Sequence, residues 1–321
     1  MSSDTQLTNK LIILRHARIL VSKSNSFTFV LARILIPSRK RSYFYCWYSY
    51  LRWVDDIADL GSSSHKEKSA FIAKQIQAIK EIYRNNTSHE FISRVTPQIV
   101  ELIEYDLNNG NILEQYIINM LECIRFDVNR AGNGLTTSLR LNYYFKQEVL
   151  AYLNAFQYFA CPIKYFFKVN ESPEGLAGKI THILRDFIKD IEENIYNISI
   201  DDYESIALDR SNAEELIKSN PFIYWVKKKV SEAEANFRLG LNNLKDHPNL
   251  KYKILVVILC FKYKLYLNKI KKDHFNLRKV YELSKMEIII RIPFLFIDLT
   301  KMSFDHVSKF RKRKTIPSNA N

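Results

Sequence analysis

Apolar positions recur along this chain at intervals of three and four residues, and no long stretch alternates as a half-buried strand would. This spacing places apolar side chains on one face of an α-helix. Turn residues and capping residues divide the pattern into predicted helices. Their ranges are 26–35, 38–60, 66–84, 97–108, 112–129, 138–167, 172–193, 211–219, 221–243, 250–271 and 277–290. Without a long linker or an internal repeat between them, we predict one large all-α domain.

The composition of the chain supports a helical fold. Its 321 residues include only 7 glycines and 8 prolines, whereas average usage of about 7% would give roughly 22 glycines. Sheet proteins need turn residues more often than this. The sequence also lacks the glycine-rich patterns GxGxxG and GxxxxGK[ST]. Any bound phosphate must therefore be held by side chains and metal ions.

The chain is strongly basic, with 48 Lys and Arg against 34 Asp and Glu, a formal net charge of +14. Such a charge favours nucleic acid, anionic lipid or small anionic substrates as partners. The basic residues are spread out and no nucleic-acid-binding motif is present, so we expect no nucleic-acid partner. The cysteines lie far apart among apolar neighbours, which predicts buried free thiols rather than disulfides. They are Cys46, Cys123, Cys161 and Cys260.

The two ends of the chain differ in character from its middle. Residues 1–21 show no secretory pattern and are predicted to be an N-terminal extension, before a helical domain over 22–300. The basic tail, 301–321, contains Arg311-Lys312-Arg313-Lys314 after an apolar stretch. That arrangement fits either contact with an anionic membrane or a solvated tail. We expect a cytoplasmic monomer, with peripheral membrane binding left open.

Two acidic clusters carry the candidate chemistry. Asp55 and Asp59 are four residues apart, as are Asp186 and Asp190. On a helix, such pairs lie on one face, where like charges repel. Apolar residues surround both pairs, so the carboxylates favour a bound cation over a solvated surface. Mg²⁺ is the natural choice, since it prefers oxygen ligands and usually binds one or two carboxylates together with substrate phosphates.

The residues around the aspartates favour diphosphate chemistry. Arg52 and Arg185 each lie beside one pair, where a guanidinium could bind phosphate oxygens. Loss of pyrophosphate from an organic diphosphate leaves a carbocation, which aromatic side chains can stabilise. The chain has 20 Phe, 19 Tyr and 3 Trp, many of them near these clusters. The pattern therefore predicts a Mg²⁺-dependent site for an organic diphosphate.

In order and spacing, these motifs resemble the squalene/phytoene synthase family of head-to-head isoprenoid synthases. Residues 48–59 are similar to its first signature, Tyr-x-x-x-Arg-x-x-Asp-Asp-x-x-Asp, and residues 180–190 match its second. Residues 28–37 resemble its Ser-Phe…Leu-Leu-Pro opening. Residues 126–130 are similar to its acidic turn, which precedes a helix that bears a tyrosine, here Tyr144.

The resemblance implies an all-α fold of the isoprenoid-synthase type, with the aspartate pairs facing across a central cavity. It implies a transferase that joins two farnesyl or geranylgeranyl diphosphates through a cyclopropyl intermediate, to a squalene- or phytoene-type product. The implied metal ligands are Asp55, Asp59, Asp186 and Asp190, and Tyr144 would handle a proton or cation. The implied substrate-binding residues are Thr28, Phe29, Tyr48, Arg52, Lys179, His182, Arg185, Lys189 and Arg278. NADPH use stays open, because no dinucleotide fingerprint is present.

The second signature departs from the family pattern. The family usually has Gln, Asn and Glu where this chain has Lys179, His182 and Lys189. The lysines add positive charge beside the predicted metal, which leaves the number of Mg²⁺ ions open. Two rival hypotheses follow: a catalytically silent relative that acts in assembly or lipid binding, and a basic membrane-surface protein with structural aspartates. All four aspartates are present, which favours an enzyme.

Overall fold

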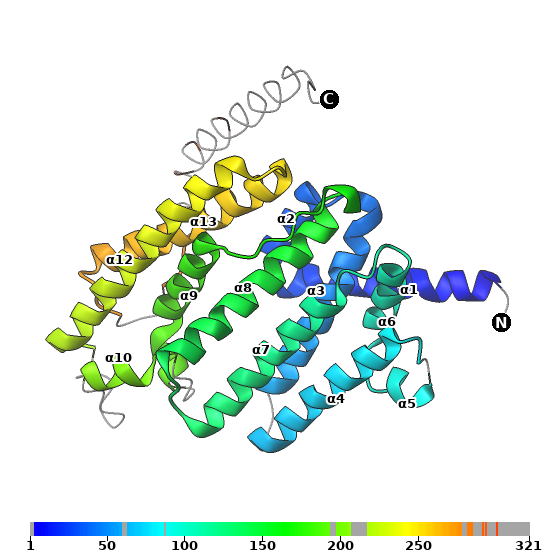
Figure 1. The fold of residues 1–321 in the computed structure, drawn as a ribbon, viewed down its shortest axis with the longest axis horizontal. Helices are drawn as coiled ribbons and strands as arrows, with labels where there is room; N and C mark the ends of the chain where they lie inside the picture. Colours follow the sequence, from blue (N-terminus) through cyan, green and yellow to red (C-terminus); the bar gives the residue numbers. More distant parts are fainter. Residues whose placement is uncertain are drawn as a thin grey trace, which may run out of the picture. The chain divides into compact units, whose positions relative to one another are not determined.

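The computed structural model describes residues 3–59, 63–86, 88–192, 197–206, 217–277 and 281–284, together with 291, 293 and 300. Every regular element in this part of the chain is helical, so the all-α prediction is confirmed. The chain divides into two compact units, residues 1–170 and 171–321 (Figure 1). The predicted boundaries of an N-terminal extension, a domain and a tail stay predictions.

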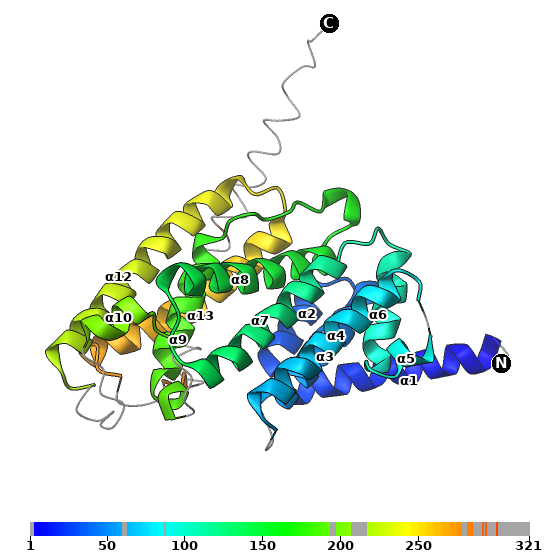
Figure 2. The ribbon, with the colours of Figure 1, turned by 60° about the horizontal axis from the view of Figure 1, so that its bottom comes forward.

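The first unit consists of eight labelled α-helices and one short 3₁₀-helix in its described part. In Figures 1 and 2, α7 lies between α4 and α8. The bounds are α1 Ser3–Ser24, α2 Ser26–Leu35, α3 Ser38–Asp59, α4 His65–Tyr83, α5 His89–Ile92, α6 Pro97–Leu107, α7 Glu114–Asn133, α8 Ser138–Ala160 and η1 Ile163–Tyr165.

The centre of this unit is α3, which contacts α1, α2, α4, α6, α7 and α8. Its middle is buried on nearly all sides, and the large rings of Phe44, Trp47 and Tyr50 are 0–1% exposed. The Phe44 ring meets Phe156 and Phe159 of α8 edge-on, at centroid distances of 5.7 and 5.5 Å. A helix that is apolar around much of its circumference must lie inside the fold. The core thereby fixes α3, which carries Asp55 and Asp59 at its end.

Helix α8 ends earlier than the sequence pattern predicted, at Ala160 rather than near residue 167. Pro162 excludes the helical conformation from the preceding residue, and Cys161 is accordingly extended, with φ −123° and ψ 155°. The buried Lys40 ammonium donates to the carbonyl oxygens of Tyr158 at 2.6 Å and Cys161 at 2.7 Å. A side chain from α3 thus satisfies carbonyl groups that the helix end leaves unpaired.

The second unit is built around the contacts of α9 with α12 and α13. The bounds are α9 Pro173–Glu192, α10 Ile200–Ser205, α12 Asn220–Asn243, η2 Leu244–Asp246 and α13 Leu250–Lys272. Phe187 of α9 packs on Phe222 and Trp225 of α12, with ring centroids 5.0 and 5.5 Å apart. At Gly240 of α12, a Cβ atom would lie 2.6 Å from the backbone nitrogen of Glu174, so the two helices need a glycine there.

Most of the predicted helices are confirmed to within a few residues, but not all. The pattern missed α1, which packs against α3 and α6 and in which Ala17 and Val21 are fully buried. Residues 211–216, 278–280 and 285–290 of two predicted helices lie outside the described residues. The remaining residues of those two predictions, 217–219, 277 and 281–284, are not helical. Of the helices described, none has the length and apolar character needed to cross a membrane.

Candidate active site

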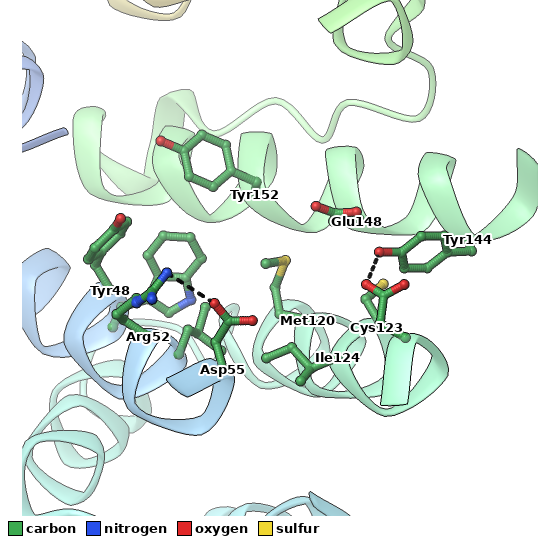
Figure 3. A pocket seen from close by; sticks show the side chains of 12 residues that line it. Tyr48, Arg52, Asp55, Met120, Cys123, Ile124, Tyr144, Glu148 and Tyr152 are labelled. Carbon is green, nitrogen blue, oxygen red and sulfur yellow. Dashed lines mark hydrogen bonds and ion pairs between the residues drawn. The ribbon is translucent and has the colours of Figure 1, made fainter. Parts of the chain in front are cut away.

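A pocket of about 210 Å³ opens between α3, α7 and α8 of the first unit (Figure 3). The core holds these three helices in place, so the side chains of the pocket project from a rigid frame. Of the predicted site residues, it brings together Tyr48, Arg52, Asp55 and Tyr144. Its full lining is Trp47, Tyr48, Leu51, Arg52, Asp55, Met120, Cys123, Ile124, Asp127, Tyr144, Glu148 and Tyr152.

Asp55, Asp56 and Asp59 form an acidic cluster at one side of the pocket, and their charges outnumber that of Arg52 beside them. Arg52 Nη1 lies 3.2 Å from Asp55 Oδ2, and the same guanidinium forms an ion pair with Asp56. Desolvation and the neighbouring Asp59 raise the pKa of Asp55 to about 6, with further contributions from Asp56 and Asp127, while Arg52 opposes the shift. The Asp55 side chain is still 40% exposed, so a cation from solvent can reach it.

Tyr144 lies across the pocket from this cluster (Figure 3), and it forms a hydrogen-bonded triad with Asp127 and Arg130 of α7. Its hydroxyl donates to Asp127, whose other carboxylate oxygen accepts from the buried Arg130 at 2.6 Å. The Tyr144 ring stacks on Phe126, with centroids 4.7 Å apart. Burial and the Asp127 carboxylate raise the pKa of Tyr144 well above its usual value. Tyr144 is therefore a neutral, precisely oriented donor at neutral pH.

Thr28 and Phe29, the predicted substrate-binding residues of α2, are not among the residues that line the pocket. Asn25 accepts from the Thr28 backbone nitrogen and donates to the Tyr48 hydroxyl at 2.8 Å. Thr28 is buried, and the Phe29 ring stacks on Tyr45 of α3 at 5.4 Å. In this structure Thr28 and Phe29 are therefore adjacent to Tyr48 and the core, and their predicted contact with substrate stays a prediction.

The chemistry of the first aspartate pair fits Mg²⁺. Asp55 and Asp59 lie one turn apart on α3, and the pKa of Asp55, raised first by desolvation, is raised further by the charge of Asp59, which a cation would neutralise. No group of three or more His, Cys, Asp or Glu side chains among the described residues is arranged to hold a metal ion. Mg²⁺ usually binds one or two carboxylates together with substrate phosphates, so Asp55 and Asp59 would supply part of its ligands.

The second aspartate pair lies on α9, and its surroundings are different. Asp186 Oδ1 accepts from Arg185 Nε at 2.7 Å, and Oδ2 accepts from Arg185 Nη2 and lies 2.8 Å from His182 Nε2. Burial opposes ionisation of Asp186, but these bonds outweigh it and hold its pKa well below the usual range. Asp190 accepts from Asn197 at 2.8 Å. Both oxygens of Asp186 are engaged by the chain itself, so this pair does not fit Mg²⁺ as the first does.

The two predicted lysines of α9 differ in exposure. Lys179 is half-buried and Lys189 is exposed, one on each side of the Arg185–Asp186 pair along α9. Arg278 lies outside the described residues. The predicted facing of the two aspartate pairs stays a prediction.

Sequence reasoning missed several residues that the structure places in these sites. Glu148 lines the pocket one turn after Tyr144, a spacing of four that could have identified it. Arg130 follows Asp127 by three residues, which also places them on one helix face. On α13, Lys262 and Tyr266 share a face close to Arg185, and nothing in the local sequence links them to α9.

The all-α fold of this chain is shared with solved structures. The structure is similar to a dehydrosqualene synthase solved with a ligand, with a TM-score of 0.69 and 14% identity over 94% of this chain and 99% of that one. It is similar to the squalene synthase HpnC from Alicyclobacillus acidocaldarius, with a TM-score of 0.63 and 12% identity over 84% and 97% of the two chains. It is also similar to a ligand complex of TcSQS, with a TM-score of 0.65 and 10% identity over 96% and 94%.

These similarities show the fold, which is that of the squalene/phytoene synthase family, as the sequence motifs predicted. No family model matches this chain, and no curated protein matches its sequence. Solved structures with this fold include a dehydrosqualene synthase and a squalene synthase.

Proposed function

We propose that this protein is a Mg²⁺-dependent transferase that condenses two prenyl diphosphates head-to-head and releases pyrophosphate. The observation that carries the proposal is the pocket between α3, α7 and α8, where the acidic cluster of Asp55 faces a wall of aromatic and apolar side chains. An ionised diphosphate needs cations, and a prenyl carbocation needs a site that excludes water and offers π-faces. This pocket places carboxylates that could hold cations next to aromatic side chains that could stabilise a carbocation, all within one unit.

Each group in the pocket has a role that follows from its position. Asp55 and Asp59 would hold Mg²⁺, which when bound supplies positive charge to the diphosphate leaving group. Arg52, held by Asp55 and Asp56, can bind a phosphate oxygen. The rings of Trp47 and Tyr152, 5.7 Å apart, can flank the prenyl chain.

Tyr144 is the candidate for proton or cation handling. Its hydroxyl is fixed by Asp127, and Asp127 is fixed in turn by Arg130, so the oxygen is held in one orientation before substrate arrives. A preorganised dipole requires no rearrangement when charge develops, which is why such groups can lower a barrier.

The test is release of pyrophosphate from farnesyl or geranylgeranyl diphosphate in the presence of Mg²⁺, with the hydrocarbon product identified by mass. Wild type should turn over only with the metal. Asp55→Asn should lower turnover by about 10²-fold or more, because the metal and its ordering effect are lost. Glu104→Gln, an exposed carboxylate of α6, is the matched control and should leave turnover unchanged.

Product analysis with and without NADPH decides whether the reaction includes a reduction, and comparison of the two substrates decides the chain length. Turnover of wild type in excess EDTA would contradict the proposed metal dependence.

A second candidate function, a catalytically silent relative that acts in assembly or lipid binding, is favoured by the engagement of both Asp186 oxygens by Arg185 and His182. Absence of pyrophosphate release from both substrates with Mg²⁺ would favour this alternative.

A further inference from the structure

A second pocket, of about 340 Å³, lies between α7 and α8, and we name it the α7/α8 pocket. Of its lining residues, only Cys123 and Tyr144 also line the pocket of Asp55. It is therefore a separate cavity that adjoins the candidate active site. Pockets that bind small molecules have volumes of about 300–1,000 Å³, so the α7/α8 pocket is large enough for a small ligand.

One face of each helix forms the α7/α8 pocket. Glu122, Phe126 and Asn129 of α7 follow one another at spacings of four and three, and Arg140 and Gln147 of α8 are two turns apart. Residues at these spacings lie on the same side of a helix. The packing of α7 beside α8 (Figures 1 and 2) brings the two faces together around one cavity.

Several polar groups in this pocket have hydrogens to donate. The Arg140 guanidinium lies 5.4 Å from the centre of the Phe126 ring, and within the described residues its side chain forms no ion pair or hydrogen bond. Gln147 Oε1 accepts from Asn119 at 3.3 Å, and its Nε2 group has no acceptor in the described part of the chain. The exposed Asn129 amide likewise has no hydrogen-bond partner among the residues described. The pocket thus presents one guanidinium and two amide groups to a ligand.

The charges around the pocket favour an anion. Glu122 is the one carboxylate among its lining residues, and Glu122 Oε2 forms an ion pair with Arg125 Nη2 at 2.7 Å. The nearby Asp127 is engaged by Arg130 and Tyr144. The positive charge of Arg140 is therefore not balanced by an acid in the described structure, and an anion that enters meets a guanidinium with five N–H donors.

A phosphate monoester matches these donors better than a carboxylate does. A guanidinium can bind two oxygens of a phosphate at once. The third terminal oxygen can then accept from the amide nitrogens of Asn129 and Gln147, whereas Arg140 alone would occupy both oxygens of a carboxylate. A cavity of 340 Å³ holds more than an ion, since a water molecule occupies about 30 Å³. Phe126 and the buried Cys123 give the wall an apolar part, which suits a small apolar or aromatic ester group.

We infer that the α7/α8 pocket binds a small organic phosphate monoester, with its phosphate on Arg140 and its carbon part against Phe126. The site uses no metal ion and is separate from the one proposed for prenyl diphosphates. The inference goes beyond the proposed function and does not depend on it.

The first experiment is calorimetric titration of the full chain with phenyl phosphate in excess EDTA, which prevents metal-dependent binding at Asp55. Wild type binds. Arg140→Gln should bind about tenfold more weakly or worse, because a pair of charge-assisted hydrogen bonds is lost. Arg238→Gln, at an exposed arginine of α12, is the matched control and should bind as wild type does.

A second set of variants tests the geometry of the donors. Arg140→Lys should bind more tightly than Arg140→Gln but more weakly than wild type, because an ammonium keeps the charge and loses the paired donors. Asn129→Ala should weaken binding about threefold or more through the loss of one hydrogen bond. Asn142→Ala, at an exposed asparagine of α8 that does not line the pocket, should bind as wild type does. Circular dichroism checks that each variant is folded.

Two further probes test the class of ligand. Benzoate and inorganic phosphate should each bind more weakly than phenyl phosphate. Benzoate that binds as tightly would contradict the choice of a phosphate, and inorganic phosphate that binds as tightly would contradict an organic ligand.

The location of the site is tested in the same titrations. A wild type that does not bind phenyl phosphate, or isotherms of Arg140→Gln and wild type that superimpose, would overturn the inference. A loss in Arg52→Gln equal to that in Arg140→Gln would also overturn it, since the probe would then lie in the pocket of Asp55. None of these outcomes depends on turnover of a prenyl diphosphate, so the proposed function is tested separately.

Discussion

At the scale of single residues, the neighbours of a carboxylate decide its chemistry. Asp55 and Asp186 each stand four residues before a second aspartate and beside an arginine. The pKa of Asp55 is raised to about 6 by desolvation and other carboxylates, whereas that of Asp186 is held low by Arg185 and His182. The same sequence pattern thus yields a carboxylate that needs a cation and another that already has one.

Tyr144→Phe tests the triad at the far side of the pocket. The variant keeps the ring on Phe126 but loses the hydroxyl that donates to Asp127. We expect turnover to fall by about 10- to 10²-fold with little change in KM, because the lost donor acts where charge develops. Pyrophosphate release measures this. Tyr143→Phe is the matched control, since Tyr143 is the exposed neighbour on α8, and a similar loss there would contradict the assignment.

At the scale of elements, helix α8 depends on a lysine of α3. Lys40 is 4% exposed and donates to the carbonyl oxygens of Tyr158 and Cys161. Lys40→Met should lower the free energy of unfolding by about 1–3 kcal/mol, because it leaves buried acceptors without a donor. Chemical denaturation of both proteins measures the difference. A variant as stable as wild type would show that these bonds contribute nothing net.

Lys40 should also make the stability of the fold rise with pH. Burial, with a contribution from Arg39, lowers the pKa of Lys40 from 10.5 to about 8, while Cys161 and Asp106 oppose the shift. Between these pH values the unfolded chain keeps a proton that the folded chain has lost, so stability rises with pH. The advantage of wild type over Lys40→Met should grow by about 2 kcal/mol from about pH 7 to 9.5.

A matched surface variant separates this effect from other titrating lysines. Lys272→Met, on the exposed end of α13, should show no such change with pH. An advantage that stays constant or shrinks as pH rises would contradict the assignment to Lys40.

The contact between α9 and α12 also depends on one position. At Gly240 a new Cβ atom would lie 2.6 Å from the Glu174 backbone nitrogen, which cannot move without shifting α9. Gly240→Ala should therefore destabilise the protein by about 1–3 kcal/mol through overpacking. At Gly178 the nearest atoms belong to the Tyr263 ring, at 3.1 Å, and that ring can shift. Gly178→Ala should lower the melting temperature less than Gly240→Ala, and the reverse order would contradict this account.

At the scale of the whole molecule, a net charge of +14 combines with apolar side chains on the surface. Leu7, Leu11 and Ile12 of α1 are 59–61% exposed, and Arg15 and Arg18 on the same helix are exposed too. Apolar and basic side chains on one helix are typical of binding at an anionic membrane surface. The predicted basic tail, Arg311–Lys314, lies outside the described residues.

We therefore predict that the protein binds anionic vesicles more tightly than neutral ones, and that salt weakens binding because exposed charges are screened over about 8 Å at physiological ionic strength. Co-flotation with vesicles measures it. A Leu11→Glu, Ile12→Glu double variant should float less than wild type. Leu139→Glu, at an apolar residue of α8 that is 83% exposed, is the control. Equal flotation with neutral and anionic vesicles would contradict membrane binding through charge.

Local patterns in the sequence were enough to predict the fold class, most helices and the pocket residues Arg52 and Asp55, while Tyr48 and Tyr144 were implied by the family resemblance. They sufficed because helix periodicity, capping and i,i+4 spacing act between residues that are close in the chain. Tertiary structure alone decided the rest. It placed Lys40 at the end of α8, 118 residues away in sequence, and Lys262 beside Arg185. Long-range packing brings together groups that are far apart in the sequence, and no local pattern encodes which of them meet.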